Sequence, residues 1–168
     1  MGAPGTGAMN LIGGEGAPGG VADDALENAN ILLRIAPYHQ WLGVQLVEVE
    51  KGRVVLRLPF RPEFVGNPMI PAYHGGITAA LVDLSGGVVL FSELRIPTPT
   101  IDMRVDYLRP ALAGKALIAE ARVRAIGKTV AHVDVVIHDE DGREVATGTG
   151  VYTVKDLGRA DAGTFPIG

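Results

Sequence analysis

The 168-residue chain has no cysteine, and aromatic residues make up only 5% of it. Without cysteine it forms no disulfide, no zinc–cysteine centre and no thiol nucleophile, which fits a reducing compartment such as the cytoplasm. A long basic run is also missing, and the formal net charge is -4, so an electrostatic nucleic-acid binder is disfavoured. We find no segment long and apolar enough to predict a membrane span. Hydrophobic residues, at 47%, indicate an ordinary globular core.

Both ends of the chain are poor in large apolar side chains. Eight of the 23 glycines lie among the first 20 residues, which predicts a disordered tail over residues 1–22. A Gly-x-Gly-x-x-Gly pattern at residues 14–19 resembles a dinucleotide-binding fingerprint. No strand precedes it and Pro18 interrupts it, so low complexity is the better interpretation. Residues 155–168 predict a loose C-terminal tail, which leaves one domain over residues 23–154.

The body of the chain switches between two periodicities. Helical spacing predicts a helix from Asp23 or Asp24 to about Ala36, ended by Pro37. Residues 75–94 contain no proline and leave no wide polar face, which predicts a helix buried on all sides. Alternation of apolar and polar residues predicts strands over residues 44–50, 53–59, 100–107, 115–126, 129–138 and 143–154. This order predicts an α+β fold, with one antiparallel sheet wrapped around one long central helix.

The sequence His74-Gly75-Gly76 stands where a proline-containing loop enters the predicted buried helix. The first amides of a helix lack internal partners and attract negative charge. Glycine lets a ligand approach such amides closely, which suits a carbonyl oxygen that becomes an oxyanion. The alternative is that the two glycines only allow tight packing of the helix start.

Asp83 lies in the middle of the same apolar helix. A buried carboxylate is costly unless it is paired or used, and Ala79, Ala80 and Gly87 leave space beside it. Asp83 is therefore a candidate general base or nucleophile. The alternative is a structural aspartate bonded to backbone or to an arginine.

No metal site or cofactor is predicted. His132, Asp134 and His138 share one face of one strand, but Asp134 and His138 would lie about 13 Å apart, too far for one ion. A solvated sheet face is the preferred interpretation.

Several stretches resemble the hotdog-fold acyl-CoA thioesterases, and in particular the phenylacetate-pathway type, which includes the thioesterase-superfamily member 2 kind. They are Asn67, HGGITAALVD (74–83), TIDMRVDYLRPA (100–111), GKTVAH (127–132) and DEDGREVATGTGVY (139–152). The resemblance covers about residues 38–154. It implies a hotdog fold that works as a homodimer or a dimer of dimers, hydrolysing the thioester of an acyl-CoA or aroyl-CoA without a metal.

The resemblance also implies roles for individual residues. Asp83 matches the catalytic acid, Gly75 the amide that polarises the thioester carbonyl, and His74 the histidine beside that carbonyl. Asn67 matches the asparagine that orients water or the thioester, and Thr100 takes the place of a hydroxyl residue near the water.

Substrate-binding groups are also expected. Gly76 belongs to the anion-attracting start of the helix, and Lys128, Arg104 or Arg109 would meet the phosphates of coenzyme A.

The alternative function is a non-catalytic hotdog module that binds an acyl-CoA or a protein partner. A hotdog dehydratase is a third option, but no second acid–histidine pair is placed for it.

Spacing along the helix predicts that each active site uses two chains. Gly75 and Asp83 are eight residues apart, or about 12 Å along a helix axis. A reacting thioester needs both groups within about 3 Å of its carbonyl. Two antiparallel copies of the helix, crossing near Ala79, would bring Asp83 of one chain opposite Gly75 of the other.

Overall fold

The computed structural model describes residues 21–155, so the predicted tails fall almost entirely outside the described residues and stay predictions. In chain order the elements are α1 (Val21–Ile35), α2 (Pro37–Leu42), β1 (Gln45–Glu50), β2 (Arg53–Leu58), a 3-10 turn (Pro62–Phe64), β3 (Val65–Asn67), β4 (Ala72–Tyr73), α3 (Gly75–Leu94), β5 (Thr100–Tyr107), β6 (Leu117–Ile126), β7 (Val130–Asp139) and β8 (Glu144–Thr153).

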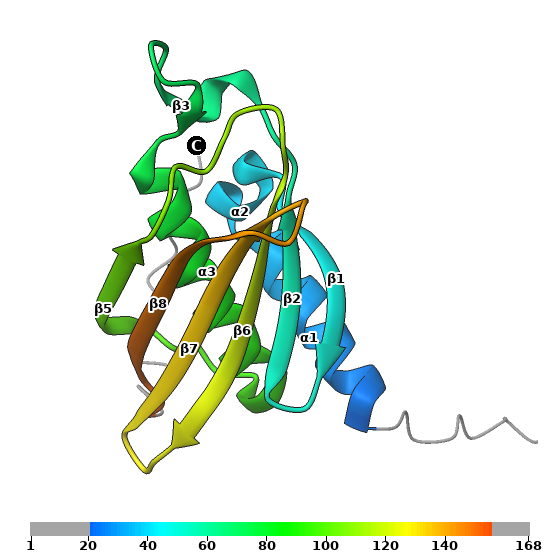
Figure 1. The fold of residues 1–168 in the computed structure, drawn as a ribbon. Coiled ribbons are helices and arrows are strands. Elements are labelled where there is room, and N and C mark those ends of the chain that lie inside the picture. Colours follow the sequence, from blue (N-terminus) through cyan, green and yellow to red (C-terminus); the bar gives the residue numbers. More distant parts are fainter. Residues whose placement is uncertain (1–20, 156–168) are drawn as a thin grey trace, which may run out of the picture.

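Six strands form one antiparallel sheet in the order β1-β2-β6-β7-β8-β5. Helix α3 runs along one face of this sheet, and α1 lies beside it (Figure 1). The strand that follows α3 in the chain, β5, therefore closes one edge next to the last strand, β8. The predicted α+β architecture, an antiparallel sheet around one long helix, is confirmed.

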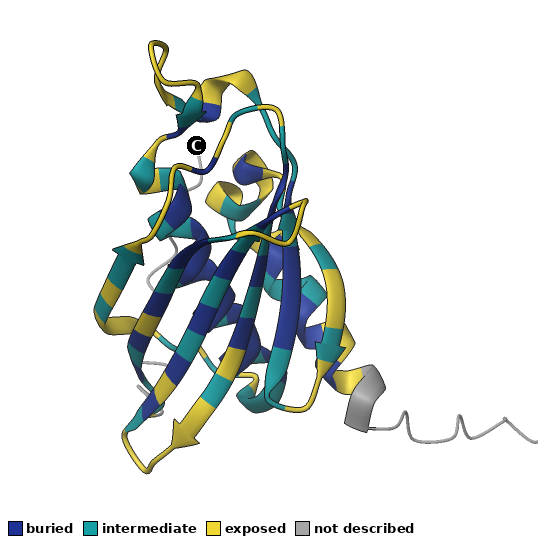
Figure 2. Ribbon diagram, viewed as in Figure 1, coloured by how far each residue is buried: buried dark blue, intermediate teal, exposed yellow. Residues whose placement is uncertain are grey.

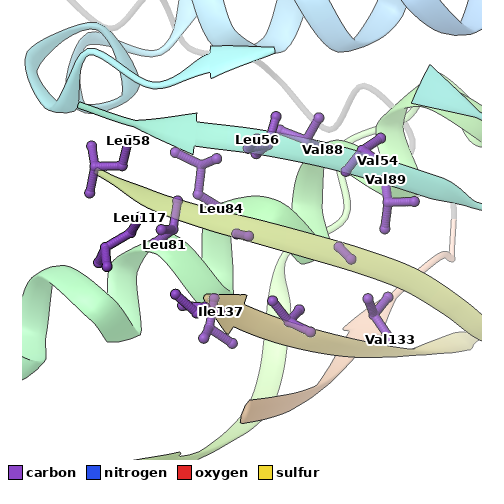
Figure 3. Packing of buried hydrophobic residues seen from close by; sticks show 14 of the residues in the cluster. Val54, Leu56, Leu58, Leu81, Leu84, Val88, Val89, Leu117, Val133 and Ile137 are labelled. Carbon is purple, nitrogen blue, oxygen red and sulfur yellow. The ribbon is translucent and has the colours of Figure 1, made fainter. Parts of the chain in front are cut away.

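The core lies between α3 and the sheet. Strand alternation places buried residues of β2, β6, β7 and β8 against the helix, and they appear as dark bands in Figure 2. Figure 3 shows the contact between buried side chains of α3 and those of β2, β6 and β7. The labelled residues are Val54, Leu56, Leu58, Leu81, Leu84, Val88, Val89, Leu117, Val133 and Ile137. This contact fixes where α3 begins relative to the strand ends.

Two segments differ from the prediction. Pro37 ends the first helix as expected, but it also begins the short helix α2, because the first helical position needs no N–H donor. The segment from residue 61 to 73, expected to be a loop, contains the 3-10 turn and the β3–β4 hairpin, in which Val65 pairs with Tyr73. This hairpin leads directly into His74 and so sets the start of α3.

The expectation that α3 is buried on all sides is wrong for a single chain. One side packs on the sheet, whereas Ala79, Ala80, Asp83 and Gly87 stay partly exposed on the other. By length and composition α3 is also a candidate membrane span, with a mean hydropathy of 1.6, contrary to the expectation that no segment qualifies. Packing against the sheet leaves 56% of that segment buried, as in the core helix of a folded domain.

Candidate active site

His74 is the residue that caps the start of α3. Its backbone N–H donates to the carbonyl of Phe64 at 2.7 Å, which ties the helix start to the preceding hairpin. Its ring Nδ1 accepts a hydrogen bond from the backbone N–H of Gly76 at 2.9 Å. A neutral imidazole that accepts at Nδ1 carries its proton on Nε2. The side chain therefore presents Nε2–H as a hydrogen-bond donor.

Three glycines leave room for the groups around His74. A Cβ on Gly76 would lie 2.9 Å from Nδ1 of His74, so the folded-back ring requires glycine there. A Cβ on Gly66 in β3 would lie 2.6 Å from Cα of His74. A Cβ on Gly75 would contact the ring of Tyr107 at 3.4 Å. Tight packing, the alternative interpretation of the His-Gly-Gly sequence, thus describes Gly76 well.

Tyr107, at the end of β5, is the long-range partner of the helix start. Its hydroxyl donates to the backbone carbonyl of Gly75 at 2.9 Å. Among the hydrogen bonds of residues 21–155, none uses the N–H of Gly75. The first turn of α3 is therefore anchored through its carbonyl while one of its amides stays available to a ligand.

A cavity of about 530 Å³ opens beside this helix start. Asn67, His74, Gly75, Tyr107 and Arg109 line it. Asn67 uses its side-chain oxygen to accept from the N–H of Met69 at 2.9 Å, which leaves the amide nitrogen to face a ligand. Apolar residues complete the wall: Ile70, Ala72, Tyr73, Leu108, Pro110, Ala111 and Val145. The cavity thus combines polar groups at the helix start with an apolar wall.

Asp83 lies two turns further along α3 and is not among the cavity-lining residues. The hydroxyl of Thr100, at the start of β5, donates to its Oδ1 at 2.6 Å. None of the ion pairs within residues 21–155 involves Asp83. No arginine among the described residues therefore pairs with Asp83, which leaves hydrogen bonding as the structural alternative. The predicted neighbours Asp83 and Thr100 do lie together.

Tyr152 of β8 holds the backbone of α3 at Asp83. Its side chain is buried between α3 and β8, where Gly86 and Gly150 leave the space that its ring occupies. Its hydroxyl donates to the backbone carbonyl of Asp83 at 3.1 Å. Burial, and then the charge of Asp83, raise the pKa of Tyr152 far above its ordinary value, so it remains a proton donor at neutral pH.

The predicted site residues thus form two groups within one chain. Asn67, His74 and Gly75 meet at the cavity, while Asp83 and Thr100 meet elsewhere. The eight residues between Gly75 and Asp83 span about 12 Å of helix.

The three cationic residues predicted to bind the substrate do not lie together within one chain. Arg109 lines the cavity and donates to the carbonyl of Glu144 at 2.7 Å. Arg104 is exposed and paired with Asp106 at 2.9 Å. Lys128 lies in the exposed turn between β6 and β7, at the end of the sheet where Thr100, Tyr152 and Ala131 are in register. Lys128 therefore belongs to the same end as Asp83.

Comparison with known proteins identifies the family. The model of the thioesterase superfamily matches residues 72–146, which contain His74, the glycines, Asp83 and Thr100. A putative esterase of Halobacterium salinarum is 38% identical over 125 residues, which are 68% of this chain and 82% of that protein. The chain belongs to the thioesterase superfamily.

Two further likenesses concern a relative in sequence and a solved structure with the same fold. A medium/long-chain acyl-CoA thioesterase, YigI of Salmonella typhimurium, is 33% identical over 70% of this chain and 85% of that protein. The solved structure of the Escherichia coli PaaI protein from the phenylacetic acid degradation operon covers 80% of this chain and 95% of that chain at 24% identity, with a TM-score of 0.74. The PaaI likeness concerns the fold. The predicted hotdog thioesterase resemblance is confirmed.

Across residues 21–155 no three His, Asp or Glu side chains are grouped so that they could hold an ion. On β7, Asp134 pairs with Arg124 at 3.3 Å, as expected of a solvated sheet face.

Sequence reasoning missed Gly66, Tyr107 and Tyr152. The available signal for Tyr107 was its position at the end of an alternating strand, but alternation only groups it with the apolar side chains of that strand and does not indicate a hydrogen bond. Tyr152 and Gly150 sit two residues apart on β8, a spacing that puts both on one face. Tyr107 bonds to a residue 32 positions away in the chain and Tyr152 to one 69 positions away, so only the folded topology shows what these tyrosines touch.

Proposed function

We propose that this protein hydrolyses the thioester of an acyl-CoA or aroyl-CoA in a site built from two copies of the chain. Family membership and the printed activity of its 33%-identical relative support thioester hydrolysis. The observation that carries the two-copy arrangement is the separation of Gly75 and His74 from Asp83 and Thr100 within one chain.

The helix start supplies the electrophilic half of the site. The thioester oxygen accepts a hydrogen bond from the N–H of Gly75, and Nε2–H of His74 adds a second donor. Both donors stabilise the negative charge that develops on this oxygen when the carbonyl carbon is attacked. The amide of Asn67, at the same cavity, orients the thioester or the attacking water.

Asp83 of the second copy supplies the other half. As a general base it takes a proton from water, whose oxygen attacks the carbonyl carbon; as a nucleophile its own oxygen attacks and water later releases the acyl group. In both routes the carbon–sulfur bond breaks and the coenzyme A thiolate leaves and takes up a proton. Thr100 holds the carboxylate in place through its hydroxyl hydrogen bond.

The exposed surface of one chain fits a symmetric pair. The partly exposed side of α3 carries the small residues Ala79, Ala80 and Gly87, so two helices can approach closely around a two-fold axis. At the adjoining sheet edge, Ile101 of β5 is 57% exposed, so an apolar side chain is available there to a second copy. Pairing across this surface would set each Asp83 opposite the Gly75 of its partner. A dimer or a dimer of dimers is therefore expected.

The substrate follows from the lining of the cavity. Its apolar wall accepts an acyl or aryl group, and the name of the YigI relative favours medium or long acyl chains. We expect Arg109 at the cavity, Lys128 of the second copy or Arg104 to meet the phosphates of coenzyme A. The cysteine-free composition keeps the cytoplasm as the predicted location.

A thiol-release assay over a panel of acyl-CoAs and aroyl-CoAs tests this function. We expect turnover of at least one member by the wild-type chain. Measurable binding with no turnover on any member would contradict hydrolysis and favour the non-catalytic module.

A further inference from the structure

A chain of hydrogen bonds crosses the start of α3. The hydroxyl of Tyr107 donates to the carbonyl of Gly75, and the N–H of Gly76 donates to Nδ1 of His74. The Gly75 carbonyl and the Gly76 N–H belong to one peptide unit. This peptide therefore links Tyr107 to His74 through two hydrogen bonds. The distance is 2.9 Å both from the Tyr107 hydroxyl to the carbonyl oxygen and from the amide nitrogen to Nδ1 of His74.

We infer that Tyr107 is a positioning residue that fixes the tautomer and orientation of His74 through the Gly75–Gly76 peptide. A hydrogen bond to a peptide carbonyl polarises that peptide and makes its N–H a better donor. The better donor holds Nδ1 as an acceptor, which keeps the proton on Nε2. Tyr107 itself need not touch the reacting thioester.

The geometry around this chain of hydrogen bonds supports this role. Glycine at 76 lets the His74 ring fold back onto its donor, because a Cβ there would lie 2.9 Å from Nδ1, whereas a Cβ at 75 would only touch the Tyr107 ring at 3.4 Å. Tyr107 is held by β5, where it pairs with Ala146 of β8. The orientation of a side chain at the helix start is thus set by the end of a strand 32 residues away.

The kinetic side of this inference rests on the proposed hydrolysis, whereas its spectroscopic side does not. The test variant is Tyr107→Phe, which keeps the ring and removes the donor. The matched control is Tyr38→Phe, because Tyr38 is 50% exposed against 56% for Tyr107 and lies on α2, outside the site. Nitrogen-15 NMR of the imidazoles reports the tautomer, and the signal of His74 among the four histidines is identified by its loss in His74→Gln.

In the wild type and in Tyr38→Phe, we expect His74 to show one tautomer with the proton on Nε2. In Tyr107→Phe we expect a mixture of tautomers, a fall in kcat of about fivefold and a KM within about twofold of the wild type. Because Tyr107 acts through His74, adding Tyr107→Phe to His74→Gln should change kcat by less than about twofold.

Two results would overturn the inference. One is an unchanged His74 tautomer in Tyr107→Phe. The other is the same fivefold fall in kcat when Tyr107→Phe is added to His74→Gln. If the wild type releases no thiol from any substrate, the proposed function fails, and the NMR comparison of Tyr107→Phe with Tyr38→Phe still decides the positioning role.

Discussion

The start and the middle of α3 are built in opposite ways. At the start, backbone groups point outward: His74 caps the helix, and Gly75 keeps a free amide beside an apolar cavity. In the middle, the hydroxyl of Thr100 donates to the carboxylate of Asp83, and the hydroxyl of Tyr152 donates to its backbone carbonyl. The first region offers donors for a thioester oxygen but no carboxylate, whereas the second offers a carboxylate whose neighbouring donors, Thr100 and Tyr152, are already bonded to Asp83. In the proposed mechanism each region supplies one half of the groups that thioester hydrolysis needs.

The two regions also differ in how tightly they are held. Around His74, Gly66 and Gly76 bring backbone and ring together at distances that a methyl group would disturb. Around Asp83, the support is a hydrogen bond from an exposed strand residue and one from a buried tyrosine. Substitutions in the first region should therefore lower kcat by displacing the donors. Substitutions in the second region should lower kcat by removing the carboxylate or the hydroxyl that bonds to it.

The largest effect is expected from removing the acid. Asp83→Asn keeps the shape and the contact with Thr100 but removes the base or nucleophile, so kcat should fall by about 10³-fold. Thiol release measures kcat, and a thermal melt by circular dichroism checks that the fold is retained. The matched control is Asp134→Asn on the outer face of β7, where kcat should be unchanged. Near wild-type kcat in Asp83→Asn would refute its role, and loss of the fold would favour a structural aspartate.

A smaller loss is expected from crowding the other region. In Gly66→Ala the new methyl group would lie 2.6 Å from Cα of His74, so the hairpin or the helix start must shift. We expect about 2 kcal/mol of lost stability and a fall in kcat of about 10²-fold, because a displaced donor misaligns the thioester. Urea unfolding and thiol release measure the two quantities. Wild-type values of both would show that the glycine is not needed for the site.

The smallest effect is expected from the hydroxyl beside Asp83. Thr100→Val keeps the side-chain shape but removes the donor at 2.6 Å from Oδ1, so kcat should fall by about tenfold with little change in stability. Thr149→Val, an exposed strand threonine on β8, is the matched control and should leave kcat unchanged. Equal kcat values for the two variants would remove Thr100 from the site.

Local patterns in the sequence predict the elements well where a single periodicity dominates. The limits of α3 and β5 are as expected, and His74, Gly75 and Asp83 are recognisable from their place in α3, whereas Thr100 was indicated only by the family resemblance. The β3–β4 hairpin was missed because two prolines and a three-residue strand carry no visible alternation. Tyr107 and Tyr152 were missed because their roles depend on contacts between distant segments.

One further difference concerns α3 itself. Its composition predicts burial on all sides, but packing in one chain covers only the side that faces the sheet. The rest of the apolar pattern is explained if a second copy covers the side that carries Ala79, Ala80 and Asp83. In that proposed pair the apolar pattern of α3 would match its full environment, of which a single chain shows only part.

The most direct test of the two-copy site is to mix two inactive chains. Asp83→Asn lacks the acid but keeps the helix start, and Gly75→Leu blocks the helix start but keeps the acid. In an exchanging mixture of equal amounts, half of the pairs are mixed and each holds one intact site, so about one quarter of the wild-type activity should return. Native mass spectrometry of the mixture verifies the exchange. Folded variants that exchange subunits and yet stay inactive together would contradict a site shared between two copies.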